Sequence, residues 1–239
     1  MTPTTEQLFR ASDETWPAAR VWNQGPWTLR EGKGGGKRVS AATANGPVTE
    51  ADIEAAEDAM RSIGQTPLFM LREDEDRLDG LLAGKGYDVV DPVTIYTLPI
   101  ERLTDKPIPR VTAFAVWEPL AIMTEIWAAG GIGPARLDVM ARAKVKTGIF
   151  SRWNEMPGGV AFAAVHDGIC MVHAVEVRPE QRRQGVADWM MRKAAFWGQE
   201  QGASHLAVLC VKQNEGANAL YRALGFAPAG GYHYRQHPA

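Results

Sequence analysis

The chain has 239 residues, of which 45% are apolar, and a formal net charge of −2. This length predicts one or two domains with a buried core. The near-neutral charge argues against a nucleic-acid-binding protein, no apolar run is long enough to span a bilayer, and the first residues lack the features of a secretory signal. Cys170 and Cys210 lie in apolar runs, and we expect buried free thiols. We therefore expect a cytoplasmic protein that binds neither nucleic acid nor membrane.

The first part of the chain predicts an alternation of helices and strands. We expect a helix over residues 6–24, two strands around the glycine-rich turn of WTLREGKGGGKRVSAAT, and a helix at TEADIEAAEDAMRSI with Thr49 as its N-cap. PLFML, EDRLDGLLAGKGY and VTIYTLP predict a strand, a helix and a strand. LTDKPIPR, from Leu103 to Arg110, is polar and carries two prolines, and we interpret it as a linker.

The rest of the chain continues the alternation. VTAFAVW predicts a strand, and residues 119–145 predict helix interrupted by GGIGP. GVAFAAVHDGICMVHAVEV predicts two strands around an Asp-Gly turn. The loop RPEQRRQGVA, an amphipathic helix, the strand HLAVLCV, the helix ANALYRALGF and a last strand around Tyr232–Tyr234 follow. The predicted fold class is α/β with a mixed sheet.

The loop from Arg178 to Ala187 has the features of an anion site. It lies between a predicted strand and a predicted helix, and a helix N-terminus offers unpaired N–H groups and a partial positive charge. Gly185 lets the backbone approach a ligand closely, and Arg182 and Arg183 add positive charge. The second half of the chain also carries the positive part of the charge balance, which favours an anionic ligand there.

Two motifs in this half resemble the GNAT superfamily of N-acetyltransferases. Arg182-x-x-Gly185-x-Ala187 after a strand is similar to the acetyl-CoA pyrophosphate loop of that family, although the family often has glycine where Arg183 and Ala187 stand. VKQNEGANALYRALGF then resembles the family's strand followed by Asn-x-x-Ala-x-x-Leu-Tyr-x-x-x-Gly-Phe, with every position filled. The resemblance covers roughly residues 111–239. It implies a GNAT acyltransferase fold, with residues 107–239 as the acetyltransferase domain and residues 1–106 as an accessory domain.

The resemblance also implies which residues hold the co-substrate, acetyl-CoA. No Cys/His cluster has the spacing of a metal site, so we expect no metal. The backbone of Val175–Val177 would pair with the pantetheine arm, and the loop from Arg182 to Asp188 would hold the pyrophosphate. Asn214 would bond the cofactor, or act as a helix N-cap. The predicted cofactor-binding residues are Val175, Glu176, Val177, Arg182, Arg183, Gln184, Gly185, Val186, Ala187, Asp188, Asn214, Ala217 and Tyr221.

Direct attack of an amine on the thioester, which the resemblance implies, calls for an acid and a base. Tyr221 is the predicted acid for the leaving thiolate, with a core tyrosine as the alternative. His173 and Glu176 are the candidate bases, and on a regular strand they would point to opposite faces. Either can instead be structural, the histidine as a hydrogen-bonded core residue and the glutamate as a partner of Arg178 or Arg182. If the base works through water, neither His173 nor Glu176 is essential. We also expect no catalytic cysteine.

The first half repeats a pattern of the second without its candidate site. Both contain a strand, a helix, a glycine and an aromatic residue, which indicates either a duplicated domain that has lost its chemistry or a common way of ending a helix. GKGGGKR is rich in glycine but precedes a strand-like run, and we interpret it as a flexible hairpin turn. The aligned pairs are Gly86 with Gly225, Tyr87 with Phe226, Glu75 with Asn214, and Leu82 with Tyr221.

The expected activity is acetyl-CoA-dependent N-acetylation of a small-molecule amine or a peptide amine, by a monomer or homodimer. The alternative is a CoA-binding or regulatory module that keeps the fold and transfers nothing, and the presence of both Asn214 and Tyr221 counts against it. A third hypothesis makes the first half a partner-binding module of a protein-modifying enzyme.

Overall fold

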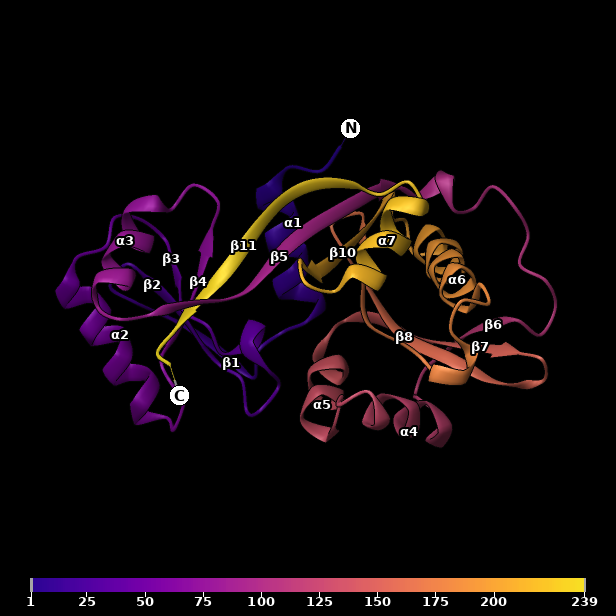
Figure 1. Cartoon of the computed structure of the whole chain (residues 1–239), viewed down its shortest axis with the longest axis horizontal. Helices are drawn as coiled ribbons and strands as arrows, with labels where there is room; N and C mark the ends of the chain where they lie inside the picture. The colour runs from indigo at the N-terminus through magenta and orange to yellow at the C-terminus, as the bar shows by residue number, and fades with distance from the viewer. Residues whose placement is uncertain (1, 239) are drawn as a thin grey trace. The chain divides into compact units, whose positions relative to one another are not determined.

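The computed structural model describes residues 2–238, which divide into two compact units, each of mixed α/β structure. Unit 1 contains the chain up to Pro17, Ile95–Cys210 and Asn214–Ala229. Unit 2 contains Ala18–Thr94, Val211–Gln213 and the chain from Gly230 onward. Strands β5 (Asp88–Pro99) and β11 (Ala227–Gln236) contribute residues to both units (Figure 1). The predicted division into residues 1–106 and 107–239 stays a prediction.

Unit 1 carries the predicted anion loop. Its sheet has the strand order β5-β10-β9-β8-β7-β6, in which β6 to β9 are successive antiparallel neighbours and β10 runs parallel to β9. Methionine and alanine side chains of α6 pack on one face of this sheet and form the main core. The elements are α1 (Thr5–Thr15), β6 (Ala113–Val116), α4 (Ala121–Ala129), α5 (Pro134–Arg142), β7 (Val145–Trp153), β8 (Met156–His166), β9 (Ile169–Val177), α6 (Val186–Glu200), β10 (His205–Val211) and α7 (Glu215–Ala223), with short 3-10 turns η2 (Ile100–Arg102) and η3 (Pro179–Gln181).

Unit 2 has its own apolar core, built around Trp27, Phe69 and Tyr87. Its strands β1 (Arg20–Gln24), β2 (Trp27–Glu31) and β3 (Thr43–Ala44) form a small antiparallel sheet, and β4 (Leu68–Arg72) pairs antiparallel with β11. Its helices are α2 (Glu50–Ser62) and α3 (Asp76–Gly84), and η1 (Lys37–Val39) is a 3-10 turn. Helix α2 begins as predicted, because the Thr49 hydroxyl accepts from the Asp52 N–H and the Asp52 carboxylate accepts from the Thr49 N–H.

Two sequence expectations are wrong, and one strand was not predicted. The helix predicted over residues 6–24 ends at Thr15, and residues 20–24 form a strand, because Pro17 cannot continue a helix and disfavours helical backbone at the preceding residue. The run RVSAAT begins in a 3-10 turn, forms an isolated bridge between Ala42 and Phe69, and enters the two-residue strand Thr43–Ala44 only at its last residue. Strand β7 was not expected. Gly148 interrupts its apolar run, and an added Cβ there would lie 2.6 Å from the Met123 side chain.

The repeated pattern corresponds to the same local geometry in each unit. Gly86 and Gly225 both adopt left-handed backbone, with φ of +83° and +88°. The aromatic residue after each glycine donates its N–H to the carbonyl five residues earlier, on Leu82 in one case and Tyr221 in the other, both at 3.0 Å. This equivalence supports the residue alignment made from the sequence, while a duplicated origin stays a prediction.

Candidate active site

The parallel strands β9 and β10 are paired for only part of their length. Their register runs from Ile169 opposite His205 to Val172 opposite Val208, and it ends there although both strands continue. Over residues 175–177, β9 stays paired with β8, with Glu176 opposite Val160 and Val177 opposite Gly159. The edge of Val175–Val177 on the β10 side is therefore available to an extended ligand that pairs like a strand.

A β-bulge breaks β9 just before this edge. Phe162 lies opposite His173 and Val160 opposite Glu176, so Ala161 alone faces both Ala174 and Val175. Ala174 adopts positive φ (+51°), and its carbonyl accepts a 2.8 Å hydrogen bond from the indole N–H of Trp127 on α4. Bulges of this kind redirect the side chains that follow them.

The bulge changes where the two candidate bases point. Val172 belongs to the core beneath α6, and Val175 and Val177 pack against the same core. His173 and Glu176 therefore share the opposite face of the sheet, and the expectation that they point to opposite faces is wrong, because the extra residue shifts the alternation of the strand.

Glu176 lies at the edge of a cavity of about 310 Å³. The cavity is bounded by one face of α4, the end of β9 and the loop that follows it. Burial raises the pKa of the Glu176 carboxyl, and the positive charges of Arg182 and Arg136 partly offset this effect. The carboxyl group packs tightly on Gly130, where an added Cβ would lie only 2.5 Å from the glutamate Cδ.

His173 is buried away from this cavity. Its side chain is 4% exposed, and it packs beside Trp16 and stacks on Phe162. Its Nε2 lies 2.9 Å from the Thr15 hydroxyl, which donates its own proton to the Ala11 carbonyl at 2.6 Å. Because the Thr15 hydroxyl already donates its proton to Ala11, it can only accept a hydrogen bond from His173. The imidazole Nε2 is therefore the protonated ring nitrogen and donates to the hydroxyl oxygen. The geometry matches the hydrogen-bonded core histidine that we weighed as the alternative, and a catalytic role for His173 stays a prediction.

The loop after β9 ends at an uncapped helix N-terminus. Gly185 is the N-cap of α6 with φ of +80°, and no side chain caps the first turn. The position where a Cβ would project from Gly185 is open, with no atom within 4 Å. Arg182, Arg183 and Gln184 are exposed beside it, and Arg183 also adopts positive φ. The first-turn N–H groups and two guanidinium groups thus match what a pyrophosphate needs.

Several predicted cofactor residues already have structural partners. Arg182 donates through Nε to the Val177 carbonyl at 3.2 Å. Val186 is buried in the core, so only its backbone can reach a ligand. The Asp188 carboxylate accepts from Arg192, which is also paired with Asp105 of the predicted linker. Ala187 and Ala217 are partly buried against the core, and Gln184 donates to the Glu180 carbonyl.

Tyr221 and Asn214 lie on the second motif. Tyr221 is 5% exposed between the rings of Tyr96 and Phe226. Burial, and then the nearby Cys210, raise the pKa of its phenol, so the hydroxyl keeps its proton at neutral pH. The Asn214 side chain accepts from the Ala217 N–H at 3.1 Å and caps α7, which is the structural role weighed from the sequence.

Cys170 and Cys210 are buried free thiols, as expected. Burial raises the pKa of Cys170 well above its ordinary value and that of Cys210 to about 11, so both stay protonated. Among residues 2–238, no group of three or more His, Cys, Asp or Glu side chains is arranged to hold a metal ion. No helix in the same range is long and apolar enough to cross a membrane.

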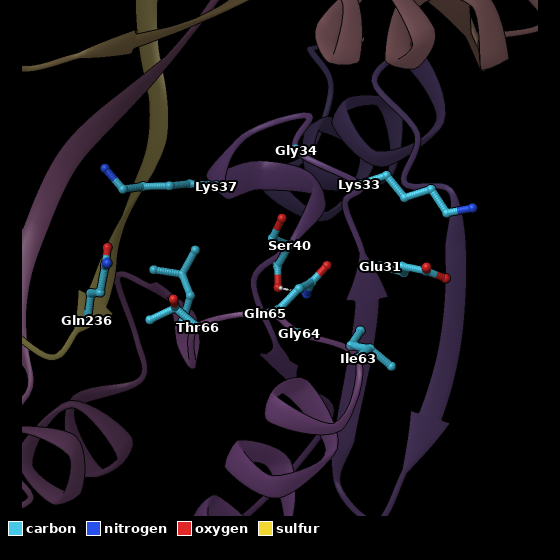
Figure 2. A pocket seen from close by; sticks show the side chains of 11 residues that line it. Glu31, Lys33, Gly34, Lys37, Ser40, Ile63, Gly64, Gln65, Thr66 and Gln236 are labelled. Carbon is cyan, nitrogen blue, oxygen red and sulfur yellow. Dashed lines mark hydrogen bonds between the residues drawn. The ribbon is translucent and has the colours of Figure 1, made fainter.

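The glycine-rich segment of unit 2 lines a different cavity, of about 400 Å³ (Figure 2). Its turn is tied by Gln65, whose side chain accepts from the Gly32 N–H at 2.7 Å and donates to the Arg30 carbonyl at 2.8 Å. Lys37 is paired with Asp91 at 2.6 Å. The segment leads into a 3-10 turn of three residues, which lacks the aligned N–H groups of a long helix. The segment is a turn, as predicted, but it is not a hairpin, because a 3-10 turn follows it in place of the expected strand.

The comparisons with known proteins agree with the family resemblance of the two sequence motifs. Residues 145–226 match the acetyltransferase (GNAT) family, so the C-terminal part of the chain carries a GNAT acetyltransferase domain. The chain is 25% identical to the uncharacterized N-acetyltransferase YobR of Bacillus subtilis (strain 168), over 96% of this chain and 97% of that protein.

Solved structures support the same fold. A GCN5-related N-acetyltransferase from Kribbella flavida superposes with a TM-score of 0.75 at 20% identity, over 100% of this chain and 97% of the other. A tandem GNAT protein from the clavulanic acid biosynthesis pathway gives 0.61 at 13% identity, over 89% of this chain and 78% of the other. At these identities the likeness shows the fold.

Sequence reasoning missed three residues of this site. Trp127 holds the bulge, and Gly130 makes room for Glu176. Gln181, within the loop itself, has a buried side-chain oxygen with no hydrogen-bond partner among residues 2–238. The glycine in GGIGP was visible as a helix breaker, but its contact with β9 was not. No sequence signal pairs an indole with a carbonyl that lies 47 residues away.

Proposed function

We propose that the chain is an acetyl-CoA-dependent N-acetyltransferase that moves an acetyl group to a primary amine. The observation that carries this proposal is Glu176, a half-buried carboxyl on the bulged end of β9, in a cavity that is also lined by Arg182 of the loop that leads to the uncapped N-terminus of α6. A proton acceptor and an anion-binding loop therefore meet at one place in the GNAT domain.

The residues present fit the co-substrate that the fold implies. The N–H groups after Gly185, together with Arg182 and Arg183, are suited to the pyrophosphate, and the edge of Val175–Val177 is suited to an amide-bearing arm. When bound, acetyl-CoA supplies a thioester whose carbonyl carbon accepts a nucleophile.

Glu176 is the proposed base. An amine acceptor is protonated at neutral pH and attacks only after it loses a proton, and a carboxylate in the cavity can take that proton directly or through water. The raised pKa of Glu176 brings it closer to neutrality and makes it a stronger base than an exposed glutamate.

Tyr221 is the proposed acid. Its phenol stays protonated because burial raises its pKa, so it can donate a hydrogen bond to the leaving sulfur, while full proton transfer becomes harder as that pKa rises. Removing only its hydroxyl keeps the ring between Tyr96 and Phe226. The Tyr221→Phe variant therefore tests chemistry with little change in packing.

The test is a thiol-release assay with acetyl-CoA and a panel of polyamines, amino acids, aminoglycosides and short peptides. We expect wild type to turn over at least one amine and Tyr221→Phe to lose about 100-fold in kcat. Tyr96→Phe is the matched control, because the Tyr96 hydroxyl donates to the Asn218 side-chain oxygen and has no proposed role in the reaction. If calorimetry detects acetyl-CoA binding but no amine is acetylated, a regulatory CoA-binding module is favoured. If Tyr221→Phe and Tyr96→Phe lose equal amounts of kcat, Tyr221 is not the acid.

A further inference from the structure

The cavity beside Glu176 carries a second carboxylate that the proposed chemistry does not use. Ile122, Glu125 and Ala129 lie on one face of α4 at helical spacing, and all three line the cavity together with Ile126. Glu125 therefore faces the space that an acceptor amine would occupy.

Glu125 is unusual within its own helix. α4 has the sequence AIMTEIWAA, in which Glu125 is the only charged residue. The other exposed positions of the helix are the alanines Ala121, Ala128 and Ala129. The exposed positions of α4 therefore carry no other polar side chain. Its one charged residue is therefore one of those that line the cavity.

The charges around the cavity leave Glu125 uncompensated. Arg178 and Glu180 form an ion pair at 2.6 Å, and Arg182 lies close enough to Glu176 to lower the pKa of that carboxyl. Within residues 2–238, Glu125 takes part in no ion pair. Its apolar neighbours, Ile122 and Ile126, suit a short alkyl chain between two polar ends.

We infer that the acceptor is a dicationic primary amine, an aliphatic diamine whose reacting nitrogen lies at Glu176 and whose second ammonium group lies at Glu125. This inference rests on the proposed function and adds the substrate class. A neutral tail would gain nothing from Glu125, and an anionic tail would be repelled by it.

The test compares three acceptors of matched length: diaminobutane, butylamine and aminobutyrate. We expect wild-type kcat/KM to fall in that order. Glu125→Gln should lower kcat/KM for diaminobutane about fivefold, mainly through KM, which is the effect of losing one partly exposed ion pair. The same change should leave butylamine unaffected. Glu200→Gln, which removes an exposed carboxylate at the end of α6, is the matched control and should change neither.

Equal kcat/KM for diaminobutane and butylamine in wild type would overturn the inference and leave the transferase in place. If no amine is acetylated, the proposed function fails, and calorimetry with diaminobutane decides the inference separately. Weaker binding to Glu125→Gln than to wild type and Glu200→Gln would support a dication site, while unchanged binding would rule it out.

Discussion

Replacing Gly130 by alanine tests whether the position of Glu176 controls activity. Gly130 has φ of −84°, which alanine adopts freely, so the backbone is not strained. The new Cβ would lie 2.5 Å from Cδ and 2.8 Å from Cγ of Glu176. Ordinary carbon contacts are about 3.5 Å or longer, so the carboxyl must move by about 1 Å. A displacement of that size costs about 100-fold in rate, or about 2.7 kcal/mol of transition-state stabilisation.

The assay is steady-state kcat/KM, with urea unfolding to measure stability. We expect Gly130→Ala to stay within about 1 kcal/mol of wild type, because the lower entropy of the unfolded chain offsets part of the clash. Gly133→Ala is the matched control, since Gly133 has φ of −88° and no atom within 4 Å of the added methyl. The reasoning is refuted if Gly130→Ala costs as much activity in a Glu176→Gln background as in wild type, because the effect would then not act through the carboxyl.

Two further predictions concern pH and the anion loop. Because burial raises the pKa of Glu176 in the folded state, wild type should lose stability relative to Glu176→Gln as pH rises from about 4 toward neutrality. Urea unfolding at several pH values measures this difference, and a wild type that gains on the variant with rising pH would contradict it. Gly185→Ala should lose about 1–2 kcal/mol of stability, since Gly185 has φ of +80°, and should raise the KM for acetyl-CoA. An unchanged KM for acetyl-CoA would show that the backbone at Gly185 does not contribute to binding the pyrophosphate.

The sequence determined the parts of this protein that depend on local chemistry. The N-cap at Thr49, the left-handed glycines at 86, 185 and 225, and the order of strand, loop and helix around RPEQRRQGVA all follow from which residues tolerate which backbone angles. The same reading identified the GNAT domain, because its two motifs are short and continuous in the chain. Its errors near Pro17 and Gly148 concern the type and existence of elements, since residues 20–24 form a strand where a helix was predicted and β7 was not predicted. The cytoplasmic location and the oligomeric state stay predictions.

Tertiary structure alone decided how the site is assembled. His173 and Glu176 share a face because the bulge at Ala174 adds a residue to β9, and that bulge is held by Trp127 from a helix distant in sequence. Glu176 is seated by Gly130, and the exposed glutamate of α4 is brought to the same cavity. These contacts join residues that no local pattern relates, because burial, hydrogen bonding and charge are set by whichever groups packing brings together.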